Sequence, residues 1–333
     1  MPHRLRMSLA CWDYDRTQAL RDGTVTPEGI ELVQLTLPVE ETFYRMLRHG
    51  EFDVAEMSLS SYVLSLFQPD PPFIAIPVFP SRVFRHGSIY VNKDNGVAEP
   101  SDLVGRKVGI PEYQMTAAVW IRGILDEHHG VGVRDVSYRT GGLHAAGRTE
   151  KIPLDLPDGF DVRPIASHET LDGLLAAGEL DALYSARAPR SFDPAEPDRV
   201  VRRLFADPKA TEQEYFRATG IFPIMHTVVI RRELYEANRW VARSLFDAFS
   251  LAKARMYPEL LEVTALKHSL PWGVNEAEET IALMGSDFWP YGIEPNRVTL
   301  ETFLRYSHAQ GLARKLLAPE DLFAPETAGG VLV

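Results

Sequence analysis

The feature that most constrains the fold is an alternation of short apolar strands and amphipathic helices along the first part of the chain. Strands are expected at residues 4–11, 29–37 and 52–57, and helices are expected between them at 14–21 and 40–48. A strand that is followed by a helix and then by another strand favours a parallel, doubly wound sheet. The chain is therefore expected to be an α/β protein.

The same pattern starts again near residue 100. Strands are expected at 106–110 and 180–184, with a helix at 114–128, and residues 224–231 form a further extended segment before a mostly helical end. A chain of 333 residues is long enough for two lobes of ordinary domain size. The restart predicts two α/β lobes, each with its own doubly wound sheet.

The chain is expected to cross between the lobes near 91–94 and to return near 227–231. One lobe would then be discontinuous, with residues 1–91 plus 228–333 and a helical C-terminal part, and the other would hold residues 92–227. This arrangement predicts a ligand in a hinged cleft between the lobes. The polar, Gly-rich and Pro-rich stretch 141–159 is expected to be a long surface loop, which is an unusual length unless the loop is functional or mobile.

Composition narrows the choice of partner and compartment. The net charge of -11, without a basic stripe, disfavours nucleic acid. The single cysteine, Cys11, excludes an intrachain disulfide and fits a reducing compartment. Neither a signal-peptide core of about 7–15 apolar residues nor a run of about 18 apolar residues occurs. We expect a soluble, cytoplasmic protein with no membrane partner. The sequence leaves open whether the chain forms a homo-oligomer.

Several motifs that would define a chemistry are missing. The sequence has no Gly-rich phosphate loop, no Gly-x-Gly-x-x-Gly, no Gly-x-Ser-x-Gly and no His-Glu-x-x-His. Nucleotide, serine-hydrolase and zinc-protease chemistry are therefore disfavoured. No cofactor and no metal are expected, although His86, Glu56 and His226 could together gather a divalent metal across the cleft.

Two expected strand-to-helix turns, 57–61 and 113–117, offer backbone N–H groups that would stabilise an anion. Both turns would follow the carboxyl ends of strands, where open α/β sheets bind their ligands. The alternative at the first turn is that Ser58 and Ser60 only cap a helix.

The segment 79–87 places Arg82, Arg85 and His86 among aromatic residues. Arginine suits bidentate binding of a carboxylate, and histidine moves protons near neutral pH. The alternative is a surface loop with solvated cations.

Four other residues have both a functional and a structural interpretation. Arg16 follows the first expected strand, and its alternative is an ion pair with Asp13 or Asp15. His226 could equally be a structural histidine. Glu56 and Glu112 could be bases or partners of a helix dipole.

Long stretches of the sequence resemble a known family. They are CWDYDRT at 11–17, EFDVAEMSLSSY at 51–62, IPVFPSRVFRH at 76–86, GIPEYQMTAAVWIRG at 109–123 and TGIFPIMH at 219–226. The resemblance is to the 4,5-dihydroxyphthalate decarboxylase family and covers nearly the whole chain. It implies a fold similar to that of type 2 periplasmic binding proteins. It also implies a carboxy-lyase of aromatic catabolism that converts 4,5-dihydroxyphthalate to protocatechuate and carbon dioxide.

The reaction that the resemblance implies builds negative charge on the ring, and a ring carbon must then be protonated. A hydroxylated ring is its own electron sink, so no cofactor is needed in principle. His86 is expected to move the proton, with Glu112 or His226 in reserve, while arginines and helix-start N–H groups hold carboxylate. The catalytic candidates are His86, Arg85, Glu112 and His226, and the substrate-binding candidates are Arg16, Ser58, Ser60, Ser61, Arg82, Gln114, Thr116 and Arg122.

Two other functions share the expected fold. One is a non-catalytic receptor that binds a small aromatic or carboxylate ligand for a transporter, and it needs only the anion-binding turns. The other is a biosynthetic enzyme, as in the menaquinone or thiamine-pyrimidine pathways.

Overall fold

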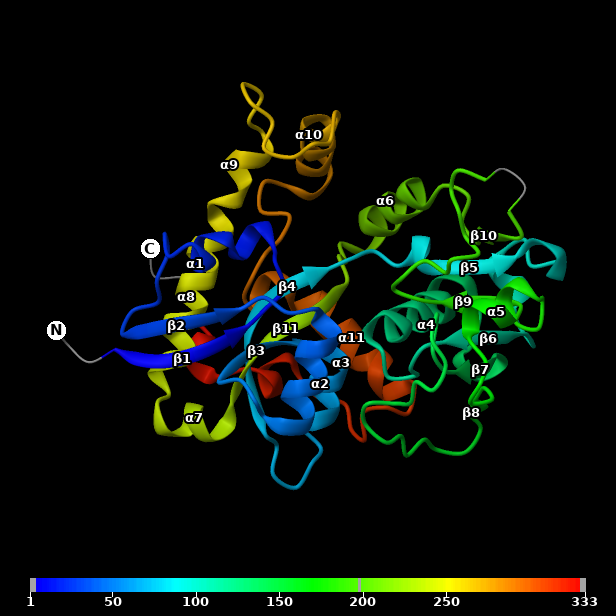
Figure 1. The fold of residues 1–333 in the computed structure, drawn as a ribbon, viewed down its shortest axis with the longest axis horizontal. Coiled ribbons are helices and arrows are strands. Elements are labelled where there is room, and N and C mark those ends of the chain that lie inside the picture. The colour runs from blue at the N-terminus through cyan, green and yellow to red at the C-terminus, as the bar shows by residue number, and fades with distance from the viewer. Residues whose placement is uncertain (1–3, 197–198, 330–333) are drawn as a thin grey trace. The chain divides into compact units, whose positions relative to one another are not determined.

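The computed structural model describes residues 4–196 and 199–329 and contains two compact units (Figure 1). The first unit holds Met1–Arg82, His226–Leu300 and Leu317–Val333, and the second holds Val83–Met225 and Glu301–Leu316. These divisions differ from the crossings expected near 91–94 and 227–231. The first falls earlier because β4 (Phe73–Arg82) ends the first unit, whereas residues 89–92 pair in the sheet of the second unit.

The first unit is built on a five-stranded mixed sheet in the order β2-β1-β3-β11-β4. β1 pairs in parallel with β2 and β3, whereas β11 is antiparallel to β3. Every residue of β3 and β4 is buried, which is typical of strands covered on both faces. Besides β4, the strands are β1 (Leu5–Ala10), β2 (Ile30–Leu35), β3 (Val54–Ser58) and β11 (Ile224–Arg231).

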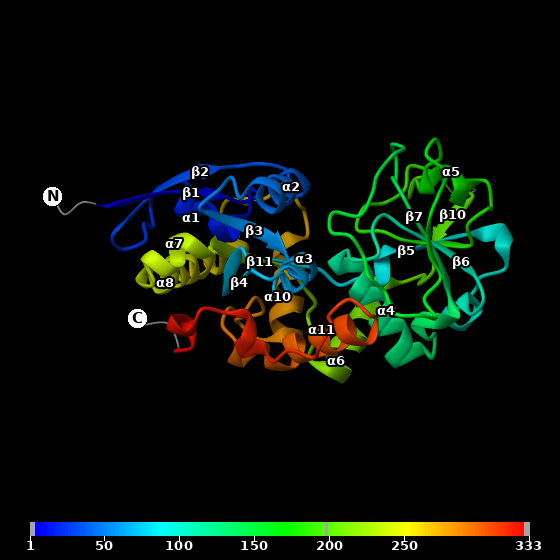
Figure 2. The same ribbon diagram turned by 90° about the horizontal axis from the view of Figure 1, so that it is seen from below.

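Helices cover this sheet, and α2 packs on β3 while α8 packs on β4 (Figures 1 and 2). The helix expected at 14–21 is a 3-10 turn, Asp15–Thr17, followed by a single α-helical turn. None of the helices in the described ranges is long and apolar enough to cross a membrane. The helices are α1 (Gln18–Arg21), α2 (Val39–His49), α3 (Leu59–Ser65), α7 (Arg232–Ala237), α8 (Trp240–Ala254), α9 (Met256–Leu260), α10 (Gly273–Met284) and the first residues, 297–300, of α11 (Arg297–Ala309).

The second unit contains a six-stranded mixed sheet in the order β10-β5-β9-β6-β7-β8. β6 is parallel to β7 and β9, whereas β5 is antiparallel to β9 and β10. Three helices accompany it, α4 (Thr116–His129), α5 (Leu171–Ala176) and α6 (Pro208–Thr219). The strands are β5 (Ile89–Asn92), β6 (Lys107–Ile110), β7 (Ser137–Thr140), β8 (Val162–Pro164), β9 (Ala182–Tyr184) and β10 (Val201–Arg203).

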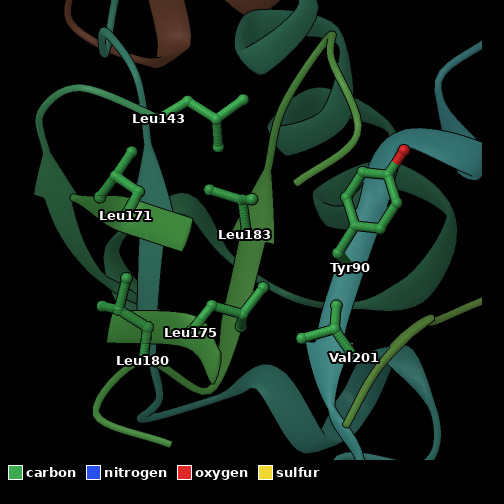
Figure 3. Close-up of a cluster of buried hydrophobic side chains, with 7 residues drawn as sticks. All are labelled: Tyr90, Leu143, Leu171, Leu175, Leu180, Leu183 and Val201. Atoms are coloured by element: carbon green, nitrogen blue, oxygen red, sulfur yellow. The ribbon is translucent and has the colours of Figure 1, made fainter. Parts of the chain in front are cut away.

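A cluster of apolar side chains forms the core between α5 and the strands of the second unit (Figure 3). One member, Leu143, belongs to the stretch that was expected to be a long loop. In the described chain no helix or strand occurs between Thr140 and Val162, so the loop is confirmed. Its first residues are nevertheless fixed, because Leu143 is buried in the cluster. The members are Tyr90, Leu143, Leu171, Leu175, Leu180, Leu183 and Val201.

Within the second unit, α4 and the part of α11 from Glu301 onward lie in close contact. The rings of Trp120 and Phe303 are 5.6 Å apart, and a Cβ atom built on Gly123 would lie 2.1 Å from the ring of Tyr306. This contact explains why residues 301–316 belong with the second unit. Only glycine leaves room for the tyrosine ring at position 123.

Gly123→Ala is expected to lower the free energy of unfolding by about 1–3 kcal/mol, because the Tyr306 ring must move to admit the methyl group. Chemical denaturation followed by circular dichroism measures this effect. Gly273→Ala is the matched control, since Gly273 also lies in a helix and its added Cβ would make only an ordinary contact of 3.6 Å. Equal stability of the two variants would contradict the packing described for Gly123.

Candidate functional site

A buried carboxylate, Glu56, is the centre of a cluster of polar groups in the first unit. One oxygen, Oε1, accepts a hydrogen bond from the Tyr14 hydroxyl at 2.5 Å and lies 2.6 Å from Nδ1 of His226. The other, Oε2, accepts from the Trp12 backbone N–H at 3.0 Å and from the Cys11 thiol at 3.7 Å. Glu56 is fully buried, so these groups replace water around its charge.

Sheet topology brings the members of this cluster together. Glu56 lies on β3, between β1 and β11. On one side, the chain that follows β1 places the Trp12 N–H and the Tyr14 hydroxyl beside Glu56. From the other side, antiparallel pairing sets His226 opposite Ser58, which places the imidazole diagonally beside Glu56.

Burial by itself would raise the pKa of Glu56, but hydrogen bonds with His226, Tyr14 and Trp12 outweigh it and hold the pKa below the ordinary value. Glu56 is therefore a carboxylate at neutral pH. Burial, reinforced by the Glu56 charge, raises the pKa of the Tyr14 hydroxyl and of the Cys11 thiol. Both groups are consequently neutral hydrogen-bond donors.

His226 is held by Glu56 on one side and is open on the other. Its ring packs edge-on against Phe43 with centroids 4.9 Å apart, and its side chain is 16% exposed. Nδ1 faces Glu56, whereas Nε2 makes no hydrogen bond to any residue in the described ranges. A carboxylate at Nδ1 favours the tautomer that carries a proton there.

Arg16 lies in the same unit with its guanidinium between two aromatic rings, 4.0 Å from Tyr14 and 4.1 Å from Trp289. Nε donates to the Pro80 carbonyl at 2.6 Å and Nη1 donates to Asp15 at 3.0 Å. The ion pair with Asp15, which was the structural alternative, is therefore present. Nη2 makes no hydrogen bond within the described part of the chain.

The two arginines of the segment 79–87 are buried, and each donates hydrogen bonds to other groups of the protein. Arg82, in the first unit, donates to the Pro290 carbonyl and to the Asn296 side chain, and burial lowers its pKa to about 9. Arg85, in the second unit, donates to the Met225 sulfur, and burial lowers its pKa to about 10. The structure therefore does not gather Arg16, Arg82 and Arg85 in one unit.

His86 lies in an aromatic environment of the second unit. The side chain is buried, and its ring centroid is 5.2 Å from that of Tyr215 and 5.4 Å from that of Phe205. Burial, with smaller effects from His129 and His128, lowers its pKa to about 4. His86 is therefore neutral at pH 7 and is poorly suited to deliver a proton.

The residues considered as metal ligands do not form one cluster. Glu56 and His226 make a pair in the first unit, whereas His86 belongs to the second. Across the described residues, no group of three or more His, Cys, Asp and Glu side chains is arranged to hold a metal ion.

The two expected anion-binding turns are both followed by helices. Ser58 caps α3, and its hydroxyl accepts from the Ser61 N–H at 3.4 Å. The capping function that was the alternative for this turn is therefore present at Ser58. Ser60 and Ser61 are buried in the first turn of α3. Thr116 begins α4, which has 14 residues, ends at His129 and is capped by Gly130.

Glu112 fastens the loop 141–159 to the turn before α4. Its Oε1 accepts from Nη2 of Arg148 at 2.6 Å and from Nζ of Lys151 at 2.5 Å. Between these cations, Glu150 accepts from the Tyr113 N–H at 2.5 Å. The sequence analysis did not single out Arg148, Glu150 and Lys151. Their charges, close together in a Gly-rich and Pro-rich stretch, could have indicated that the loop forms ion pairs.

Gln114 and Arg122 are almost fully buried in the second unit. The Gln114 amide donates to the Ile152 carbonyl of the loop at 3.2 Å. Arg122 donates to the Gln310 side chain at 2.8 Å and to the Tyr113 carbonyl at 2.7 Å, so it braces α4 against residue 310.

Solved structures define the class of protein to which this fold belongs. The chain is similar to the periplasmic aliphatic sulphonate binding protein of Escherichia coli, with a TM-score of 0.53, 13% identity and coverage of 98% of this chain and 99% of that one. It is also similar to a ligand-binding component of an ABC-type import system from Staphylococcus aureus, with a TM-score of 0.54, 11% identity and coverage of 99% of each chain. The chain has the two-lobed α/β fold of periplasmic binding proteins.

Sequence relatives define the family. A 4,5-dihydroxyphthalate decarboxylase from Comamonas testosteroni is 40% identical over 322 residues, which are 97% of each chain. A protein of the same name from Pseudomonas putida is 43% identical over 216 residues, 65% of this chain and 83% of that one. No family model matches the chain. The chain belongs to the 4,5-dihydroxyphthalate decarboxylase family, as its motifs predicted.

Tyr14→Phe is expected to lower the free energy of unfolding at pH 7 by about 1.5–3 kcal/mol, because the Glu56 carboxylate loses a donor. The folded-state pKa of Glu56 is depressed, so the stability from its hydrogen bonds is present above the ordinary glutamate pKa of about 4.3 and is lost as the pH falls through the folded-state pKa. The penalty should therefore shrink in acid.

Denaturant titrations at pH 7 and at steps down to about pH 2.5, well below the ordinary glutamate pKa, measure this difference. Tyr44→Phe is the control, since Tyr44 is exposed on α2 and its loss should leave stability unchanged. A penalty for Tyr14→Phe that stays constant with pH would show that the hydroxyl does not act on the Glu56 charge.

Proposed function

We propose that this chain is a carboxy-lyase that converts 4,5-dihydroxyphthalate to protocatechuate and carbon dioxide. The observation that carries the proposal is the 40% identity to the Comamonas testosteroni decarboxylase across 97% of both chains. The transport receptors share only the fold, at 11–13% identity. They therefore support a binding-only function less well.

The reaction breaks one bond between the ring and a carboxylate and leaves the electron pair on the ring carbon. A hydroxyl para to that carbon, once ionised, supplies electron density while the carbon accepts a proton. One C–C bond is lost, one C–H bond forms, and no electron is gained or lost overall. The protein has to hold the carboxylates, support the developing charge and supply one proton.

His226 is the group that we assign to proton delivery. Its Nε2 is open, and the contact of Nδ1 with the Glu56 carboxylate at 2.6 Å orients the ring so that Nε2 can exchange a proton with the substrate. Arg16, with Nη2 unbonded among the described residues and its face on two aromatic rings, suits a carboxylate of the substrate. The chemistry of these groups requires no cofactor.

The other candidates are assigned to support in this proposal. Arg82, Arg85 and Arg122 are buried and donate to protein groups, and Glu112 is neutralised by two cations of the loop. The start of α4, with Gln114 and Thr116, provides a place for a carboxylate in the second unit.

The compartment that we propose is the cytoplasm. Cys11 is the only cysteine, and its buried thiol donates to Glu56. A free thiol that helps to hold a catalytic carboxylate supports a reducing environment.

Incubation with 4,5-dihydroxyphthalate in deuterated water tests the reaction directly. The expected product is protocatechuate with one deuterium at the carbon that lost its carboxylate, measured by NMR and mass spectrometry. Failure to form protocatechuate, with or without added divalent metal, would exclude the named substrate.

His226→Gln is expected to reduce kcat by at least about 100-fold, because glutamine cannot supply the proton. His86→Gln should retain most of its turnover if folded, and exposed His128 provides a control variant, His128→Gln. Circular dichroism confirms folding, and steady-state kinetics give kcat. A larger loss in His86→Gln than in His226→Gln would reverse the assignment.

A further inference from the structure

The chain between α10 and α11 (Figure 1) is fixed to the sheet and helices of the first unit. Lys253 of α8 donates to the Trp289 carbonyl at 3.1 Å. Further along, the Gly292 N–H donates to the Pro77 carbonyl of β4 at 2.8 Å. The Trp289 side chain is held as well, because its indole N–H donates to the Phe79 carbonyl at 2.8 Å. The indole therefore has a fixed position beside β4.

The Trp289 ring lies against the guanidinium of Arg16. The guanidinium carbon is 4.1 Å from the centre of the Trp289 ring and 4.0 Å from the centre of the Tyr14 ring. A cation this close to an aromatic face is attracted by the ring, and the planar arginine group also stacks on it. Nε of Arg16 donates to the Pro80 carbonyl at 2.6 Å. These contacts together confine the guanidinium to one orientation.

Tyr14, the second ring beside Arg16, also belongs to the Glu56 cluster. Its hydroxyl donates to Oε1 of Glu56 at 2.5 Å, and the same oxygen lies 2.6 Å from Nδ1 of His226. The Tyr14 ring is thereby fixed through Glu56, and Trp289 supplies the other aromatic contact of Arg16. An unbroken series of contacts leads from Trp289 through Arg16, Tyr14 and Glu56 to His226.

Aromatic rings hold Arg16 without neutralising its charge. In the described chain Arg16 contacts one carboxylate, that of Asp15, through Nη1 at 3.0 Å. A second carboxylate in place of the Trp289 ring would compete with an anionic ligand for the guanidinium N–H groups, whereas a ring leaves these groups available. Trp289 thus fixes the arginine and preserves its capacity to bind an anion.

We propose that Trp289 is a positioning residue, which holds the Arg16 guanidinium in the orientation that receives a substrate carboxylate. The function of Arg16 as the carboxylate-binding group rests on the proposed function. Trp289 acts only through Arg16 and not on the reacting atoms. An arginine that is already confined loses less conformational entropy when it binds an anion. The loss of Trp289 should therefore weaken binding and leave proton delivery by His226 intact.

Calorimetric titration with phthalate measures binding without turnover, because phthalate has two carboxylates but lacks the ring hydroxyls that the proposed reaction uses. Trp289→Leu is expected to bind phthalate about tenfold more weakly than the unaltered chain. Trp289→Phe keeps an aromatic face beside Arg16 and should stay within about threefold. Trp272→Leu is the control, since Trp272 is 70% exposed in the same unit and its loss should leave binding unchanged.

Steady-state kinetics with 4,5-dihydroxyphthalate separate binding from chemistry. Trp289→Leu should raise KM about tenfold and change kcat by less than about threefold, because His226 and Glu56 are untouched. Circular dichroism checks that each variant is folded. Trp289→Met, which retains more of the side-chain volume, takes the place of Trp289→Leu if that variant does not fold.

A double-mutant cycle shows whether Trp289 acts through Arg16. In an Arg16→Gln background, Trp289→Leu should cause no further loss of phthalate binding. A residue with only a structural function would weaken binding by the same factor in both backgrounds, and that result would overturn the proposal. Unchanged phthalate binding by Trp289→Leu, or a Trp289→Phe variant as weak as Trp289→Leu, would overturn it too.

These results are separate from that of the decarboxylation assay. Absence of protocatechuate together with the expected losses of phthalate binding would exclude the reaction but support the positioning function of Trp289. Phthalate binding by Arg16→Gln as tight as that of the unaltered chain, or no phthalate binding by any chain, would overturn the positioning function together with the assignment of Arg16.

Discussion

The interaction on which the first unit depends is the burial of the Glu56 charge. A fully buried carboxylate is tolerated only when donors replace the water that it has lost, and here they come from the end of β1 and the start of β11. The need for these donors fixes the position of Tyr14 and the orientation of His226. The same interaction holds Nδ1 of the imidazole and leaves Nε2 without a hydrogen bond among the described residues.

The second unit uses buried carboxylates differently. Glu112 is neutralised by Arg148 and Lys151, so it fastens a loop and is not available as a base. Glu150 accepts a hydrogen bond from the Tyr113 N–H of the turn before α4. In the first unit, Glu56 accepts from the Tyr14 hydroxyl and the Trp12 N–H and contacts the His226 imidazole. The two carboxylates therefore differ in their partners: Glu112 contacts two cations, and Glu56 contacts an imidazole and a hydroxyl.

Much of the fold could be predicted from the sequence, because strand and helix periodicity is local. The extended segment 224–231 coincides with β11, and the family motifs are borne out by relatives at 40% and 43% identity. The antiparallel pairing of β11 with β3 joins residues 170 positions apart and leaves no local pattern. His226 could therefore be named only as a reserve group and Glu56 only as a strand-end carboxylate. The burial of His86 among aromatic rings could not be predicted from the sequence either, because Phe205 and Tyr215 are distant from it along the chain.

The central claim is that His226, held by Glu56, supplies the proton that replaces carbon dioxide on the ring. Chemical rescue tests it most directly, with His226→Gly assayed on 4,5-dihydroxyphthalate in the absence and presence of imidazole. The account predicts that turnover is lost and that imidazole, filling the vacated space beside Glu56, restores part of it, while imidazole does nothing for His86→Gly. Turnover by His226→Gly at the rate of the unaltered chain, without imidazole, would contradict it.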